Sequence, residues 1–200
     1  MSRMSRMSRM GRMNRLTGKH LGAALLGLAS LPLSAGAQTL QPGASEIVFV
    51  SKQMGVPVEG RFKSFSLPGF RFDPRKPETA QVAIQIDLRS ASMGAADVEA
   101  ELAKPEWFDS KRQPMAGFTA QSVKALGGGR FELQGPFVLK GISKPLAVQL
   151  QLTPAGLASG QFTLKRGDWQ IGAGEWADTS IVGAEVVVKF KFQFSGMAPL

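Results

Sequence analysis

The amino-acid sequence predicts an all-β fold, a closed antiparallel barrel of about eight strands with one short inserted helix. Three observations predict it. Apolar and polar side chains alternate through most of the chain after residue 45, turn residues recur at short spacing, and only one segment has helical periodicity. Strands with one apolar face need a two-sheet sandwich or a barrel, and closure removes the exposed edges of long strands.

The first half of the chain contains four predicted strands. They lie at 46–51, at 56–64, around Phe70 and Phe72, and at 82–88. In the second of these, Val56, Val58 and Phe62 would face the interior while Glu59 and its alternate neighbours face solvent. Whether the apolar faces meet a packed core or an open cavity is left undecided by the pattern.

The second half continues the same alternation. Further strands are predicted at 116–120, 131–133, 146–152, 162–164 and 185–194. Between the two halves, residues 95–103 carry apolar residues four apart among good helix formers, and Pro105 follows as a stop, so a helix is expected there. Trp107 and Phe108 after it would plug one end of the barrel, pin the helix, or line a mouth.

The first 37 residues predict a secretory signal peptide. A basic stretch without acids precedes an apolar run from Leu21 to Leu33, and small residues stand at Ala35 and Ala37. The apolar run is shorter than the ~20 residues of a membrane-spanning helix. We therefore expect cleavage near Ala37, a single barrel domain over 38–200, and a periplasmic or secreted location.

The remaining composition narrows the functional classes. Six of the 24 basic residues lie in the leader, which leaves 18 against 15 acidic residues and a net charge of +3. No concentrated basic stripe remains for nucleic acid. The chain has no Cys and no Tyr, and its one histidine, His20, lies in the leader. Without imidazole or thiol, we expect no enzyme, no metal and no cofactor.

A Gly-rich loop at 167–180 contains the acids that could support catalysis. Asp168, Glu175 and Asp178 lie there beside Trp169 and Trp176. Paired carboxylates beside aromatics are typical of glycoside hydrolysis. The simpler interpretation is a long connection whose acids are solvated or pair with Arg166.

The apolar faces of the strands are the main candidate site, because a barrel too wide for its side chains would enclose an apolar tunnel. Ten residues are expected to line such a tunnel: Val82, Ile84, Ile86, Leu146, Val148, Leu150, Phe162, Leu164, Phe190 and Phe192. Four more are expected nearer an opening: Phe62, Phe70, Trp107 and Phe108. Lys189 and Lys191 on the outer face of the last strand would be solvated, or would touch a membrane surface transiently.

The chain resembles the YceI-like family of secreted bacterial domains over about residues 45–195. Five segments in order carry the resemblance: VSKQMGVPVEGRFKSF, FDPRKPETAQVAIQIDLRSASMG, AELAKPEWFDSKRQP, FTAQSVKALGGGRFELQGPFVLKGISKPLAVQLQL and FTLKRGDWQIGAGEWADTSIVGAEVVVKFKF. The resemblance implies a lipocalin-like barrel with an elongated apolar cavity that binds a long-chain isoprenoid lipid, of polyprenyl or quinone type. Gln53 and Lys140 stand where many relatives have histidine or another polar residue, so a head-group contact at Gln53 would not titrate.

Four functions follow from these observations. The leading hypothesis is a non-enzymatic periplasmic carrier of an isoprenoid-type lipid. A structural or stress-related interaction protein with a packed barrel is the alternative. A transmembrane β-barrel is disfavoured by the absence of Tyr girdles and by the short strands. A carboxylate hydrolase would depend on the loop at 167–180.

Overall fold

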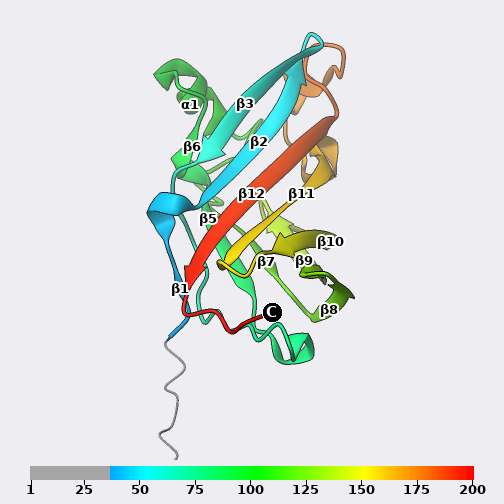
Figure 1. Ribbon diagram of the computed structural model, residues 1–200. Helices are drawn as coiled ribbons and strands as arrows, with labels where there is room; N and C mark the ends of the chain where they lie inside the picture. Colours follow the sequence, from blue (N-terminus) through cyan, green and yellow to red (C-terminus); the bar gives the residue numbers. More distant parts are fainter. Residues whose placement is uncertain (1–36) are drawn as a thin grey trace, which may run out of the picture. The chain divides into compact units, whose positions relative to one another are not determined.

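The computed structural model describes residues 37–200, which are dominated by antiparallel strands (Figure 1). Twelve strands and one α-helix make up this part of the chain: β1 Thr39–Leu40, β2 Glu46–Gln53, β3 Val56–Phe62, β4 Phe65–Ser66, β5 Ala83–Asp87, β6 Ala91–Ser92, α1 Ala96–Leu102, β7 Met115–Thr119, β8 Ser122–Gly127, β9 Arg130–Leu139, β10 Ile142–Leu152, β11 Leu157–Lys165 and β12 Glu185–Ser195. The predicted signal peptide at 1–37 lies outside the described residues, apart from Ala37 itself.

The sheet closes into a barrel. Its hydrogen-bonded order is β4-β5-β7-β9-β10-β11-β12-β2-β3-β6. β4 directly follows β3 along the chain, and β6 directly follows β5. Because β3 pairs with β6 and β4 pairs with β5, the two ends of this order meet. Between these short ladders, the Lys63 N–H donates to the Ser90 carbonyl at 3.1 Å and the Asp87 N–H donates to the Ser64 carbonyl at 3.0 Å. Residues 63–66 and 83–92 thus form the closing seam.

The strand count exceeds the predicted eight for a physical reason. One barrel strand is interrupted to give β3 and β4, and another is interrupted to give β5 and β6. In addition, β1 pairs with β12, and β8 pairs with β9, outside the closed circuit. The circuit itself has eight positions, the width at which a barrel interior can be filled by side chains or can hold one slim ligand.

Asp87 explains the interruption between β5 and β6. Its carboxylate accepts a hydrogen bond from the Arg89 N–H at 3.0 Å and forms a 2.8 Å ion pair with the Arg89 guanidinium. The Ser90 hydroxyl donates to the Asp87 carbonyl at 2.6 Å. These local bonds favour a single 3₁₀ turn over residues 88–90 instead of a continuous strand. Arg89 holds the pKa of the Asp87 carboxyl below its ordinary value, mainly through their side-chain hydrogen bond.

The predicted helix at 95–103 is confirmed as α1. Asp97 and Glu99 occupy its first turn, where the helix dipole favours negative charge. Ser92 of β6 donates a hydrogen bond to the Glu99 carboxylate, which joins the helix to the barrel. Leu102 is buried, and the helix ends before Pro105. Within residues 37–200, no helix is both long enough and apolar enough to cross a membrane.

Two predicted details are wrong. No strand forms around Phe70 and Phe72, because only an isolated bridge joins Arg71 to Gln81. Phe70 instead stacks on Phe194 with ring centroids 4.2 Å apart, near the end of the barrel where β12 finishes. Val56, expected to face the interior, is 62% exposed because β3 begins beyond the rim, directly after the turn at residues 54–55.

Candidate functional site

The interior of the barrel is not filled by its side chains. A cavity of about 620 Å³ lies between the barrel wall, α1 and the segments at 104–110 and 166–182. This volume falls in the range of ordinary ligand pockets, ~300–1,000 Å³. A packed barrel, the alternative weighed for the sequence, is therefore not what the chain forms.

A second, smaller chamber of about 100 Å³ lies farther along the barrel. Its lining consists entirely of hydrophobic side chains, including Leu67, Val82 and Leu150. Burial of apolar surface provides the driving force for occupying such a space, and no polar group in the lining would need to be desolvated.

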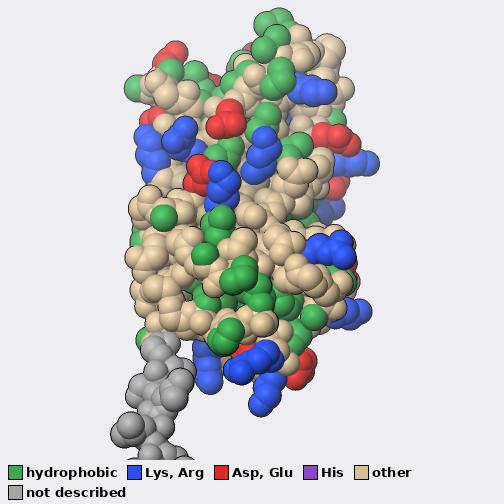
Figure 2. All heavy atoms as spheres, viewed as in Figure 1, with side chains coloured by type: hydrophobic (Ala, Val, Ile, Leu, Met, Phe, Trp, Pro, Cys, Tyr) green, Lys and Arg blue, Asp and Glu red, His purple; other side chains and the backbone are tan. Residues whose placement is uncertain are grey.

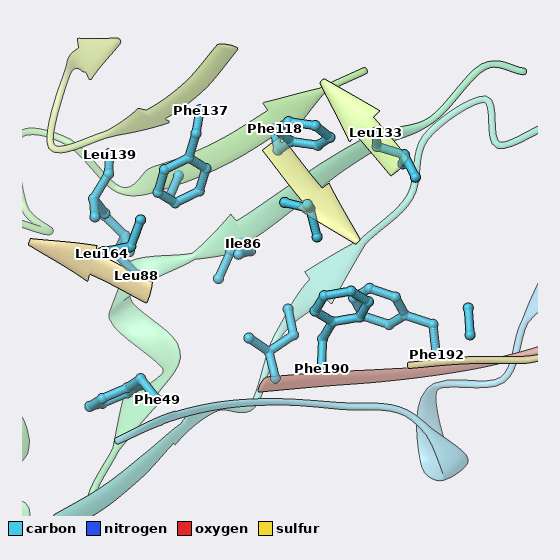
Figure 3. Close-up of a cluster of buried hydrophobic side chains, with 14 of the residues drawn as sticks. Phe49, Ile86, Leu88, Phe118, Leu133, Phe137, Leu139, Leu164, Phe190 and Phe192 are labelled. Atoms are coloured by element: carbon cyan, nitrogen blue, oxygen red, sulfur yellow. The ribbon is translucent and has the colours of Figure 1, made fainter. Parts of the chain in front are cut away.

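Five side chains line both spaces and thus form the partition between them: Ile47, Ile86, Phe137, Phe162 and Val188. The rings of Phe137 and Phe162 meet edge to face with centroids 6.2 Å apart. Figure 3 shows Phe137 and Phe190 projecting into the interior from opposite sides, with Ile86 between them. The two spaces are consecutive parts of one interior, separated by these five apolar side chains.

All fourteen residues predicted to contact a ligand line one or both spaces. The large cavity is lined by Phe62, Ile86, Trp107, Phe108, Phe162 and Leu164. The small chamber is lined by Phe70, Val82, Ile84, Ile86, Leu146, Val148, Leu150, Phe162, Phe190 and Phe192. The structure therefore brings Phe62, Trp107 and Phe108 together at the larger space but places Phe70 beside the smaller one.

Trp107 and Phe108 do more than cover an opening. Phe108 is buried against Phe62 and Phe49, with ring centroids 5.7 and 6.2 Å apart. Trp107 lies against Trp176 of the 166–182 segment, with centroids 5.6 Å apart. This aromatic group joins the segment after α1 to two barrel strands and to the loop opposite.

Arg166 organises the loop at this end of the barrel. Its side chain is only 5% exposed, and its five N–H groups donate to the carbonyls of Ile171, Gly172, Trp176, Val182 and Gly183 over 2.7–3.1 Å. The guanidinium forms no ion pair within residues 37–200. Burial holds the pKa of Arg166 below its ordinary value, but this group remains a cation under all physiological conditions.

Lys140 ties the same loop to the segment after α1. Its ammonium donates to the Pro105 carbonyl at 2.5 Å and to the Gln170 carbonyl at 2.7 Å, and burial lowers its pKa. The side chain thus holds two backbone segments together at the edge of the cavity. Gln53, the other departure from the family pattern, lines the large cavity at the end of β2.

Two acids of the loop form local contacts. Asp168 lies 4.0 Å from the Lys144 ammonium, and Asp178 accepts a hydrogen bond from the Ser180 N–H at 2.8 Å. None of the three acids pairs with Arg166, and all three are exposed, so the first of the two alternatives, solvated acids on a long connection, is the one that the structure shows. Asp168, Glu175 and Asp178 do not line the cavity, and residues 37–200 contain no group of three or more acids that could hold a metal.

Sequence reasoning missed several lining residues. Ile47 and Phe49 alternate along β2 in the same way as the residues that were selected, so the periodicity could have identified them. Arg166, Trp169 and Ile171 line the cavity from a stretch without strand periodicity. No pattern in the sequence distinguishes these three residues from those of an exposed loop.

Known proteins are similar to this chain in sequence and in fold. The family model described as "YceI-like domain" matches residues 38–194. A UPF0312 protein of Shewanella sp. (strain ANA-3) is 31% identical over 144 residues, which cover 69% of this chain and 75% of the relative.

Solved structures with the same fold include BcnA of Burkholderia cenocepacia. It is 33% identical, with a TM-score of 0.75, over 78% of this chain and 99% of BcnA. A polyisoprenoid binding domain from Saccharophagus degradans, implicated in plant cell wall breakdown, is 20% identical with a TM-score of 0.62. That alignment covers 80% of this chain and 98% of the domain, and at this identity it shows the fold alone.

Proposed function

Because the chain belongs to the YceI-like family, we propose that it is a non-enzymatic periplasmic carrier that holds a long-chain isoprenoid-type lipid inside its barrel. The apolar interior, about 620 Å³ with a further chamber of about 100 Å³ beyond the partition, is the observation that supports this function. The polyisoprenoid binding named for the Saccharophagus domain supports the choice of ligand class by analogy. The pattern of residues 1–37 supports the location.

The interior suits a prenyl chain better than a compact polar ligand. Apolar burial is worth ~25 cal/mol per Å², so a methyl-branched chain in contact with the wall side chains gains affinity along its whole length. A polar ligand would have to lose its hydration against a wall that offers few hydrogen bonds.

The direct test is to identify what the protein carries. The full chain is expressed with its leader in a Gram-negative host, purified from the periplasm without detergent, extracted with organic solvent and analysed by mass spectrometry. We expect a prenyl-chain lipid at near-stoichiometric amount. A lipid-free extract, together with failure to take up added polyprenol or quinone, would contradict the proposed function.

Narrowing the large cavity is expected to reduce lipid retention. Val186 of β12 lines the large cavity, whereas its neighbour Val187 lines neither space and occupies the opposite face of the strand. Val186→Trp should therefore lower the amount of retained lipid at least about tenfold, by removing contact area worth ~1.4 kcal/mol or more.

The matched control is Val187→Trp, the same change one position along the strand. It should retain lipid like the wild type. Equal lipid contents in the two variants, both with wild-type melting temperatures, would argue against binding in the large cavity.

The rim of the large cavity carries an exposed apolar tip, formed by Met54, Val56 and Ile181. These side chains are 79%, 62% and 42% exposed, and the Met54 N–H donates to the Ile181 carbonyl at 2.8 Å. Figure 2 shows hydrophobic side chains at this end of the molecule, where Figure 1 places the β2–β3 turn. Since Met54 and Ile181 also line the cavity, we propose that transient membrane contact occurs here, with lipid passing directly between bilayer and barrel.

Met54→Asp should slow lipid uptake from phosphatidylcholine vesicles about tenfold, because a charge replaces an apolar contact worth ~1–2 kcal/mol. The backbone tolerates this change, since Met54 has a φ of 48° and Asp adopts that region more readily than Met. Stopped-flow transfer of a fluorescent prenyl lipid measures the rate.

Lys189→Asp on the outer face of β12 is the control and tests the other candidate contact face. It should leave the transfer rate unchanged, because Lys189 is exposed on the barrel wall away from the rim. A rate reduced only by Lys189→Asp would place membrane contact on the basic strand face instead.

A further inference from the structure

Two tryptophans at the large cavity have unused hydrogen-bond donors. The indole N–H groups of Trp107 and Trp176 are buried, and neither finds an acceptor within residues 37–200. Both residues line the cavity. Buried polar groups in native proteins are nearly always paired, and an unpaired one costs ~1–3 kcal/mol.

The third tryptophan provides an internal comparison. The Trp169 indole N–H donates to the Ile142 carbonyl at 3.1 Å, although this residue lines the same cavity. The fold therefore provides a backbone acceptor for one indole N–H group at this end of the barrel. The two unpaired donors are a specific property of Trp107 and Trp176.

The backbone segments that carry the two tryptophans are held together by hydrogen bonds. The Gly172 and Ala173 N–H groups both donate to the Glu106 carbonyl, at 2.7 and 3.0 Å. The Trp176 carbonyl accepts a 2.7 Å hydrogen bond from Arg166. Each tryptophan is thus anchored through its own or an adjacent backbone group, and the two rings lie 5.6 Å apart at 51° to each other. Such prepositioning lowers the entropic cost of binding an acceptor.

The charges around the cavity favour an uncharged acceptor. Arg166 also lines it, but all five of its N–H groups are already engaged with carbonyls, so none remains for a phosphate. Asp97 and Glu101 of α1 line the same space and would repel an anion. Two neutral N–H donors match a carbonyl or hydroxyl oxygen.

We propose that Trp107 and Trp176 form a head-group subsite, in which their indole N–H groups donate to a carbonyl or hydroxyl oxygen of an uncharged isoprenoid lipid. This assignment depends on the proposed function, because it places the polar end of the carried lipid. The prenyl chain would extend from the subsite along the apolar wall toward the partition.

The test compares four probes of matched prenyl length in the full-length protein stripped of lipid: a prenylated benzoquinone, a prenyl alcohol, a hydrocarbon without a head group, and a prenyl diphosphate. Affinities are measured by equilibrium dialysis. The wild type should bind the quinone and the alcohol more tightly than the hydrocarbon or the diphosphate. Trp107→Phe and Trp176→Phe, which keep a ring but remove the donor, should each weaken quinone binding roughly fivefold more than they weaken hydrocarbon binding.

Trp169→Phe is the matched control, since its donor is already satisfied, and it should not change the preference for the quinone. A second readout follows the three indole N–H resonances by NMR in the wild type. Those of Trp107 and Trp176 should move downfield when the quinone binds, while that of Trp169 should not.

Three outcomes would overturn the subsite. The first is an equal loss of affinity for all four probes in the Trp→Phe variants, which would indicate a packing role. The second is that the diphosphate binds more tightly than the other probes. The third is that the double variant binds the quinone with unchanged affinity. Failure of the wild type to bind any probe would overturn the proposed function and the subsite with it. Hydrocarbon binding without any effect of the indole donors would overturn the subsite alone.

Discussion

Replacing Arg166 by methionine is expected to lower the free energy of unfolding by about 4 kcal/mol or more. The substitution keeps most of the buried volume but removes five donors, leaving the carbonyls of residues 171, 172, 176, 182 and 183 without partners. Each buried unpaired group costs ~1–3 kcal/mol, reduced where the loop can move to reach water. Chemical denaturation followed by circular dichroism measures the change.

Arg166→Lys separates charge from geometry. A lysine restores the cation but has three donors on one nitrogen, so it cannot reach carbonyls arranged around a planar fork. We expect it to recover less than half of the lost stability. A fully restored stability would mean that the buried charge, and not the hydrogen-bonded framework, is the stabilising feature.

Removing the Phe162 ring is expected to change which lipids bind. Phe162 lines both the large cavity and the small chamber, so Phe162→Ala should join them into one longer space. The stability loss should stay below the ~3–5 kcal/mol of a fully packed phenylalanine, because this side chain is only half-buried and already borders empty space. Each additional buried methylene contributes ~0.8 kcal/mol, so burial of about two carbons of an added isoprene unit would already shift the preference toward the longer chain about tenfold.

The opposite substitution should have the opposite effect. Phe162→Trp adds volume at the partition, so it should favour shorter chains without weakening their binding. Competition between prenyl alcohols of increasing length, read out by mass spectrometry, gives both preferences in one experiment. Identical chain-length profiles for the two variants would show that the bound chain does not pass Phe162.

Strand periodicity was sufficient to predict the barrel and the part of its lining that the strands contribute. The alternation along 146–152 and 185–194 predicted which side chains face inward, and Val148, Leu152, Phe190 and Phe192 are buried as expected. Period-two patterns work here because one face of each strand meets an apolar interior while the other meets water. Whether those residues bind a ligand remains a prediction.

The large cavity could not be predicted to the same extent. Its volume depends on how closely the wall strands approach and on where α1 and the 166–182 loop cover the barrel, and periodicity contains neither quantity. Arg166 illustrates the difficulty. In the sequence it is one of several charged residues near acids, and its burial becomes evident only once five carbonyls converge on it. The interruptions of the strands at the seam were missed for a similar reason. The hydrogen bond from the Arg89 N–H to the Asp87 side chain favours a local turn, and this turn replaces strand pairing.

The closing seam is a short part of the barrel whose turn depends on a carboxylate. It pairs only two residues in each of its ladders, whereas β9 and β10 pair ten. Asp87 stabilises the turn between those ladders as a carboxylate, and its pKa is depressed in the folded protein. A depressed carboxyl pKa contributes stability above the unfolded value and loses it as the pH falls through the folded value. Acidification is therefore expected to weaken the barrel where β3 with β4 meets β5 with β6, and a lateral opening there would expose the proposed prenyl chain along its length.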